Sequence, residues 1–122
     1  MAKESIETLI TELVHEEDWR RMRAMAACVQ GGTNAVLALI HALETAAPAL
    51  KAEITGMLAR LKDPKGGVPL VRLLRDPDET VRKAAAIALE QMAGVLDADA
   101  AEALVHELSI LQDEAQRHIV AR

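Results

Sequence analysis

The residues best suited to chemistry in this 122-residue chain are four histidines and one cysteine. Two histidines on one helix can bind a metal ion together when they are four residues apart, because both rings then share a face. His15, His41, His106 and His118 include no such pair, and a single cysteine cannot form a thiolate cluster. We therefore expect no metal site and no cofactor.

Cys28 is the remaining candidate for a catalytic group, as a nucleophile. A catalytic cysteine needs a base and an acid held near it in the fold, and the sequence identifies neither. The pairs Gly31-Gly32 and Gly66-Gly67 lack the Lys-Ser or Lys-Thr that completes a phosphate-binding loop. We expect Cys28 to be buried or to line a groove, and we predict that the chain is not an enzyme.

A cation recurs at a spacing of 31 residues, at Arg20, Lys51 and Arg82, and an apolar residue precedes each one. A residue fixed to a repeat usually serves the fold, so we interpret the series as a structural ladder that pairs with turn acids such as Asp76. The alternative is a site that captures anions. Trp19, the only tryptophan, precedes the first cation; it is expected to plug the end of the stack or, if exposed, to anchor a partner.

These cations belong to a repeat in which each unit consists of two helices, marked by apolar residues at positions i, i+1 and i+4. The first helices are expected near residues 5–15, 34–44, 66–75 and 100–110. The second helices are expected near residues 18–30, 48–61, 78–93 and 113–121. The units fall near residues 4–32, 33–63, 64–94 and 95–122, with a one-residue shift of register in the turn of the first unit.

The composition favours an all-helical protein, because the chain is 51% hydrophobic yet contains no Phe and no Tyr. A net charge of −5 and the near absence of aromatic residues that could stack on bases argue against nucleic-acid binding. No apolar run approaches the roughly 20 residues that cross a bilayer. A lone cysteine is typical of a reducing compartment. We expect a cytoplasmic protein that binds neither nucleic acid nor a membrane.

The segment 73–89 resembles a HEAT-like repeat of the phycobilisome-lyase type. In such repeats an Asp-Pro turn, here Asp76-Pro77, precedes a helix that begins with Val-Arg, here Val81-Arg82, and continues with alanines. Asp76 is the expected N-cap and Pro77 the first helical residue. The resemblance implies one domain, residues 1–122, that forms a right-handed, armadillo-like α-α superhelix (solenoid) of about four HEAT-like helix pairs.

The resemblance also implies that the second helices line a concave face that binds a protein. Shifting the exposed face of the third unit by 31 residues predicts the partner-binding residues, which are Arg21, Met25, Cys28, Thr55, Ala59, Lys83, Ala86 and Ile87. Closer packing of the stack, with Met25 and Ile87 inside it, is the alternative arrangement.

Small side chains at this face would leave a trough for an amphipathic helix, from a partner or from a second copy in a homodimer. We therefore predict a non-catalytic binding module or scaffold. Two alternatives stay open: an accessory subunit of a lyase-like enzyme that handles chromophores, since some members of the resembled family help attach bilins, and a homo-oligomeric structural protein.

Overall fold

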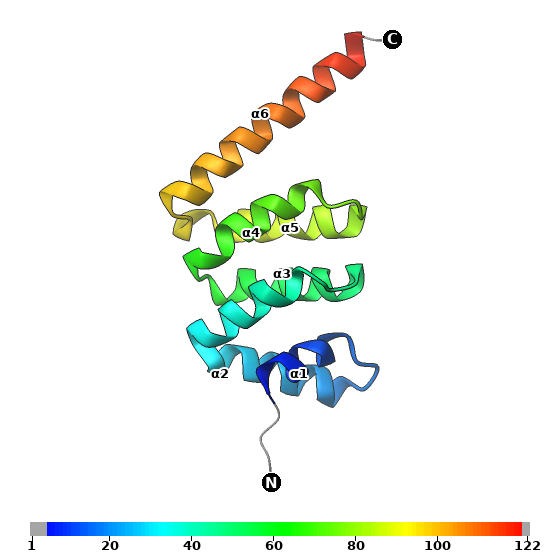
Figure 1. Ribbon diagram of the computed structural model, residues 1–122, viewed down its shortest axis with the longest axis vertical. Helices are drawn as coiled ribbons and strands as arrows, with labels where there is room; N and C mark the ends of the chain where they lie inside the picture. Colours follow the sequence, from blue (N-terminus) through cyan, green and yellow to red (C-terminus); the bar gives the residue numbers. More distant parts are fainter. Residues whose placement is uncertain (1–4, 121–122) are drawn as a thin grey trace.

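The computed structural model describes residues 5–120 of the chain, and the side chains of residues 5–117. Every regular element in this part is helical, and the helices stack in pairs along one axis (Figure 1). This confirms the all-α solenoid. The elements in chain order are α1 Ile6–Thr11, η1 Glu12–Val14, α2 Asp18–Leu43, α3 Pro48–Leu61, η2 Pro64–Gly66, α4 Gly67–Arg72, η3 Leu73–Arg75, α5 Glu79–Gln91, η4 Ala93–Val95 and α6 Ala98–Val120.

The long helix α2 contains two of the expected helices, the second helix of unit one and the first helix of unit two. They are joined without a loop at Gly32, whose φ of 56° and ψ of −132° are not helical. Glycine suits this position because it lacks the Cβ that makes a positive φ costly for other residues. The expected separation near residues 30–34 is therefore a sharp kink rather than a gap.

Among the described helices, α2 is long and apolar enough to cross a membrane by length and composition, which corrects our expectation that no segment qualifies. A core helix meets the same criteria. The buried side chains of α2 lie on both sides of the Gly32 kink, including Ala24 and Leu39, which are fully buried. Only 28% of the apolar window is buried, however, and Met22, Val29 and Leu37 are exposed, so this packing accounts for only part of the apolar character of α2.

The turn of the third unit differs in one detail from the expected cap. The side chain of Asp78, not that of Asp76, accepts a hydrogen bond from the backbone N–H of Val81, at 3.2 Å. Asp78 is therefore the N-cap of α5, and Pro77 lies outside the helix. Asp76 instead accepts a hydrogen bond from the N–H of Asp78, at 2.9 Å, which fixes the turn before the helix.

Two arginines show the true register between the first and third units. The Nη1 atom of Arg82 donates to the carbonyl oxygens of Asp76 and Pro77, at 2.8 and 2.9 Å. The Nη1 atom of Arg21 donates to the carbonyl of His15 at 2.5 Å and to the next carbonyl at 3.0 Å. Both arginines thus clamp the turn five and six residues before them, so Arg21 is the equivalent of Arg82.

The one-residue shift of register is therefore not in the turn of the first unit, where we expected it. Arg20, rather than Trp19, matches Leu50 and Val81. Trp19 matches Thr80, and both are exposed, Trp19 to 53%. Trp19 does not plug the end of the stack, because its position in the repeat faces outward.

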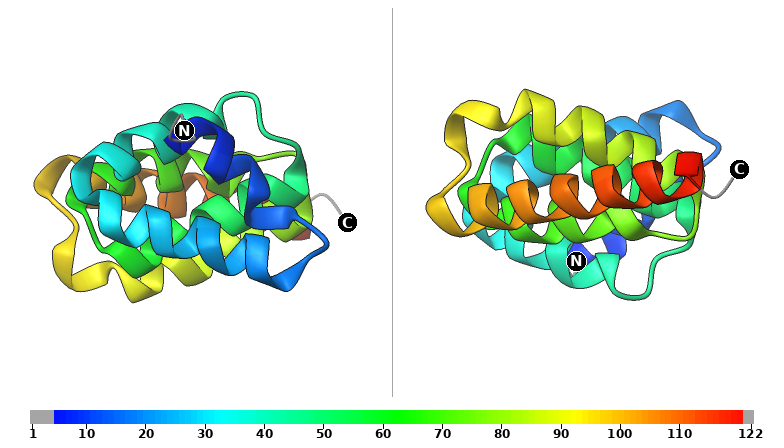
Figure 2. Two further views of the ribbon diagram at one scale, coloured as in Figure 1. Left: turned by 90° about the horizontal axis from the view of Figure 1, so that it is seen from below. Right: turned by 90° about the horizontal axis from the view of Figure 1, so that it is seen from above.

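The last helix, α6, runs unbroken from Ala98 to Val120, whereas a break near residue 112 was expected. No proline or glycine interrupts it, and residues such as Glu114 and Ala115 favour helix. Its first half packs on α4, and from above it lies across the last pair of helices (Figure 2). Residues 111–117 are exposed, and this half of α6 projects from the stack (Figure 1). The fourth unit is therefore one long helix, not a pair.

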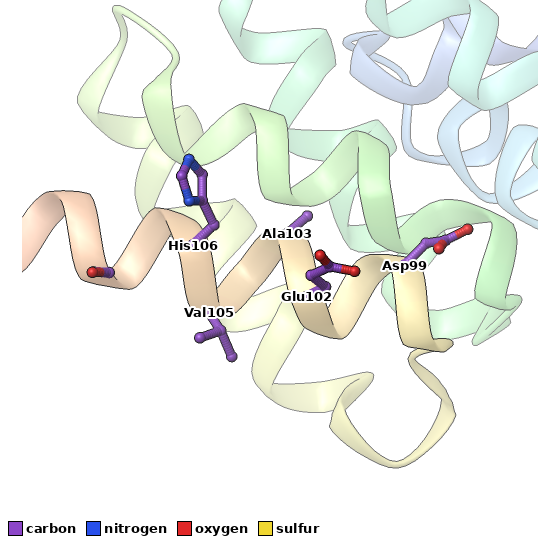
Figure 3. A pocket seen from close by; sticks show the side chains of 6 residues that line it. Asp99, Glu102, Ala103, Val105 and His106 are labelled. Atoms are coloured by element: carbon purple, nitrogen blue, oxygen red, sulfur yellow. The ribbon is translucent and has the colours of Figure 1, made fainter.

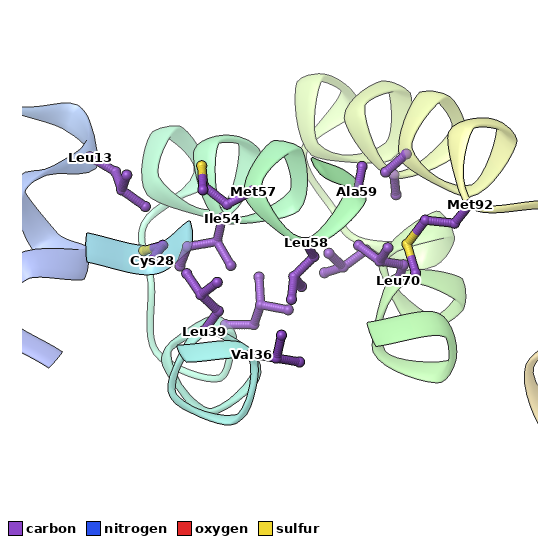
Figure 4. Packing of buried hydrophobic residues seen from close by; sticks show 14 of the residues in the cluster. Leu13, Cys28, Val36, Leu39, Ile54, Met57, Leu58, Ala59, Leu70 and Met92 are labelled. Carbon is purple, nitrogen blue, oxygen red and sulfur yellow. The ribbon is translucent and has the colours of Figure 1, made fainter. Parts of the chain in front are cut away.

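The core is one continuous cluster that runs between the helices of successive units, as Figure 4 shows. Its largest fully buried side chains are Ile10, Leu39, Ile54, Leu58, Leu70, Met92, Val36, Val71, Val81, Thr55 and Cys28. The cluster contains no aromatic residue, as the composition predicted. The helices α4 and α6 approach closely because Gly67 has no side chain: a Cβ added there would lie 2.7 Å from the Cβ of Ala100.

Candidate protein-binding groove

Three of the eight expected partner-binding residues are inside the protein. Cys28 and Thr55 are fully buried, and Ala59 is 1% exposed. The corrected register explains Cys28, because it is the equivalent of Leu89, a core residue. Thr55 and Ala59 belong to α3, which packs closely against α5, and Ala59 lies beside that helix in Figure 4. These three side chains do not form a surface, so the expected trough across three helices is wrong.

The other five expected residues remain at or near the surface, in two separate places. Arg21 and Met25 are half-buried on the first half of α2, and Arg21 is engaged with the turn before that helix. Lys83, Ala86 and Ile87 are exposed on α5. Whether any of them contacts a partner remains a prediction.

An open groove of about 320 Å³ lies between the first half of α2 and the end of α3. Most of its lining is apolar. The lining residues are Met22, Met25, Ala26, Val29, Gln30 and Arg60. Met22 is 68% exposed and Val29 51% exposed, so large apolar side chains face solvent here. Exposed apolar surface bordered by polar groups is typical of interaction sites in proteins.

Sequence reasoning identified only Met25 among these residues. The correct shift between units three and one is 61 residues, as the arginine clamps show. Applied to Lys83 and Ile87, that shift gives Met22 and Ala26, both of which line the groove. The turns of the first and third units are both followed by an arginine. Aligning these two arginines in the sequence would have given the correct shift and located the groove.

Trp19 lies one turn before the groove on α2. Its Nε1 donates to Oε2 of Glu17 at 2.5 Å, and the guanidinium carbons of Arg20 and Arg23 lie 5.2 and 5.3 Å from the ring centroid. Both distances are within the range of cation–π attraction. The ring is thereby held in place while 53% of the residue is exposed. A fixed, half-exposed tryptophan is a suitable anchor for a protein partner.

Two arginines lie at or near the groove, and only one of them forms an ion pair among the described side chains. Arg23 Nη2 lies 2.7 Å from Oε2 of Glu12, and this hydrogen bond is the main cause of a lowered pKa of the Glu12 carboxyl. Arg60, by contrast, is exposed and makes no ion pair within the described part of the chain. The groove therefore offers an apolar wall and one available cation.

The family model for HEAT repeats matches residues 36–120, more than half of the chain. The chain belongs to the HEAT repeat family. HEAT repeats generally mediate protein–protein interaction, and the family is typically non-catalytic. No curated protein sequence matches the chain. The phycobilisome-lyase type within the HEAT family stays a prediction.

The chemistry-bearing residues of this HEAT protein lie apart from one another. Burial raises the pKa of the Cys28 thiol, which disfavours the nucleophilic thiolate. The Nδ1 atom of His15 accepts the backbone N–H of Glu17 at 3.0 Å, which is a structural role. Among the described side chains, no three His, Cys, Asp or Glu residues gather as metal ligands would. His118 lies outside these described side chains.

A second hollow follows the outer surface of α6, with Asp99 at one end (Figure 3). All six residues that line it, among them Asp99 and Glu102, come from α6 itself. No second element brings a group toward them, so this HEAT repeat surface lacks the convergent side chains of a ligand site.

Proposed function

We propose that this HEAT repeat protein is a non-catalytic binding module that takes a helical segment of a protein partner into the groove between α2 and α3. The observation that carries the proposal is the exposure of Met22 and Val29 on one side of α2, next to the available cation Arg60. The general role of HEAT repeats in protein–protein interaction supports it.

The spacing of the apolar residues suits a helical partner. Met22, Met25, Ala26 and Val29 follow the i, i+3, i+4, i+7 pattern of one helix face. An amphipathic helix that lies in a groove presents the same spacing in return. Covering a large apolar side chain stabilises a complex by about 1.5–3 kcal/mol when burial is complete. Methionine side chains adapt to irregular partners, which suits an open groove.

The test compares two substitutions of exposed apolar residues on the same helix. Met22→Glu puts a charge into the groove, whereas Leu37→Glu puts the same charge at a 52% exposed position on the second half of α2, outside the groove lining. Each protein would be used to capture partners from the native cell, with the captured proteins quantified. We expect proteins that wild type and Leu37→Glu retain and Met22→Glu loses. An identical set of captured proteins for all three would contradict the proposal.

We also propose a cytoplasmic location. Its support is the single cysteine, Cys28, which is buried and not part of a disulfide. A reducing compartment is where an unpaired thiol persists most readily. Fractionation of native cells with an antibody against the protein tests this; recovery in an extracellular or membrane fraction would contradict it.

A further inference from the structure

The second half of α6 is only loosely covered by its own chain: Leu111 and Glu114 border an open hollow that the turn around Asp76 lines from the other side. Residues 111–117 are exposed, and the helix continues past the stack (Figure 1). Leu108, Leu111 and Ala115 lie three and four residues apart, which places them on one face. Leu108 is 54% and Leu111 39% exposed. Because helices gain most of their stability in proteins from packing an apolar face, this face is expected to be covered in solution.

The charge of α6 restricts what can cover it. Between residues 98 and 117 the helix carries five carboxylates and one arginine. Glu114 lies three residues after Leu111, at the edge of the apolar face; its charge acts on Arg75 across the open hollow, but no ion pair forms within the described residues. Pairing of α6 with α6 of another copy would bring like charges together. An apolar surface that carries an available cation is the complementary partner.

The groove between α2 and α3 is such a surface, with Met22 and Val29 as its exposed apolar residues and Arg60 as its cation. It lies in the first two units, at the opposite end of the stack from α6 (Figure 1). The α6 helix of the same chain therefore cannot fill it, whereas the α6 helix of a second copy can.

We propose that two copies of this chain form a reciprocal dimer, in which the projecting half of each α6 lies in the α2–α3 groove of the other. Leu108 and Leu111 then cover Met22 and Val29, and Glu114 faces Arg60. Exchange about a two-fold axis uses both free surfaces of both copies and closes the assembly. This inference rests on the proposed function, since it names the occupant of the same groove.

The main test is the mass of the protein in solution, by size-exclusion chromatography with light scattering over a range of concentrations. Wild type is expected to be a dimer. Leu108→Glu on the helix and Met22→Glu in the groove should each give folded monomers, with unchanged helical circular dichroism. The matched controls add the same charge nearby: Ser109→Glu on α6, outside the apolar face, and Leu37→Glu on α2. Both controls should remain dimers.

Mixing the two monomeric variants gives the sharper result. A chain with Leu108→Glu keeps a working groove, and a chain with Met22→Glu keeps a working α6. One intact contact is therefore left between them, and we expect a heterodimer that neither variant forms alone, weaker than the wild-type dimer. A monomeric wild type would overturn the inference. So would a dimeric Met22→Glu beside a monomeric Leu108→Glu, because that combination indicates pairing of α6 with itself.

Charge reversal tests the ion pair separately. Arg60→Glu and Glu114→Arg should each weaken the dimer about five- to ten-fold, because an exposed attraction becomes a repulsion. Both changes in one chain should restore most of the affinity. No recovery in the double variant would contradict the placement of Glu114 opposite Arg60.

The two proposals can fail independently. If wild type is monomeric but Met22→Glu loses captured proteins, the groove binds a different protein and only the dimer is wrong. If Met22→Glu changes neither the mass nor the captured proteins, the groove is not a binding site and both proposals are wrong.

Discussion

Lys51 and Asp76 join the second and third units: Nζ of Lys51 lies 2.8 Å from Oδ2 of Asp76. The side chain of Asp76 is only 7% exposed and that of Lys51 21%. The hydrogen bond from Lys51 is the largest cause of a lowered pKa of Asp76, followed by the N–H of Asp78. This contact confirms for Lys51 the expected pairing of the cation series with turn acids, whereas Arg82 binds the turn carbonyls instead.

We predict that Asp76→Asn lowers the free energy of unfolding by about 1–3 kcal/mol at pH 7, because it removes a charged hydrogen bond from a sheltered site. The pKa of Asp76 is lower in the folded protein than in the unfolded chain. Its carboxylate therefore stabilises the fold above the usual aspartate pKa of about 3.9, and this contribution is lost as the pH falls through the lower folded value.

Urea unfolding of both proteins at pH 7 and pH 3 measures this. The difference between wild type and Asp76→Asn should shrink at the lower pH. Asp99→Asn is the control, because Asp99 is exposed and makes no ion pair within the described residues. A difference for Asp76→Asn that stays constant from pH 7 to pH 3 would show that the charge is not the cause.

Ala59 and Ala86, both predicted to bind a partner, should respond differently to substitution by a large side chain. Ala59 is 1% exposed, so Ala59→Arg places a long cation in the core and should cost several kcal/mol, or prevent folding. Ala86 is exposed, so Ala86→Arg should change stability by no more than about 0.5 kcal/mol. Thermal melts followed by circular dichroism distinguish the two. Equal melting temperatures would mean that α3 and α5 do not pack as described.

Two leucines on the same expected core face differ in burial. Leu89 is 4% exposed, and Leu89→Ala should cost about 2–5 kcal/mol, as truncation of a buried leucine does. Leu74 is only half-buried, so Leu74→Ala should cost less than Leu89→Ala. The midpoints of urea unfolding give both losses of stability, provided that the dependence of the free energy on urea concentration is the same for all proteins. A larger loss for Leu74 would contradict the packing of α5 against the core.

Gly32 should resist substitution for a backbone reason alone. An added Cβ would meet nothing within 4 Å, yet φ is 56°. We expect Gly32→Ala to destabilise the protein by about 1 kcal/mol or more, because a side chain disfavours this conformation. Gly56→Ala is the matched control: it also meets nothing within 4 Å, lies inside α3, and should stabilise by about 0.5–1 kcal/mol. If both changes stabilise, the kink at Gly32 does not require its positive φ.

Local sequence was sufficient to predict the bounds of helices whose ends are marked by residues that start or stop a helix. The second helix of unit two was predicted at residues 48–61, and α3 has these bounds. Pro48 can begin a helix there, and Asp63-Pro64, which starts the next element, follows directly after its end. Where such signals are missing the prediction was wrong: the segment around Asp113 contains no breaker, and α6 continues through it.

The sequence by itself determined that the chain is all-helical and which face of most helices is apolar, because both follow from periodicity within single helices. It also determined that the units repeat about every 31 residues, because similar residues recur at that spacing. Only the tertiary structure decided which repeated positions reach the surface. Thr55 and Ala86 occupy the same place in successive units, yet Thr55 is fully buried and Ala86 is exposed. The reason is physical: α5 packs against α3 and covers Thr55, whereas within residues 5–120 no further second helix is stacked on α5. Exposure in a stack depends on the neighbouring unit, which no single repeat encodes.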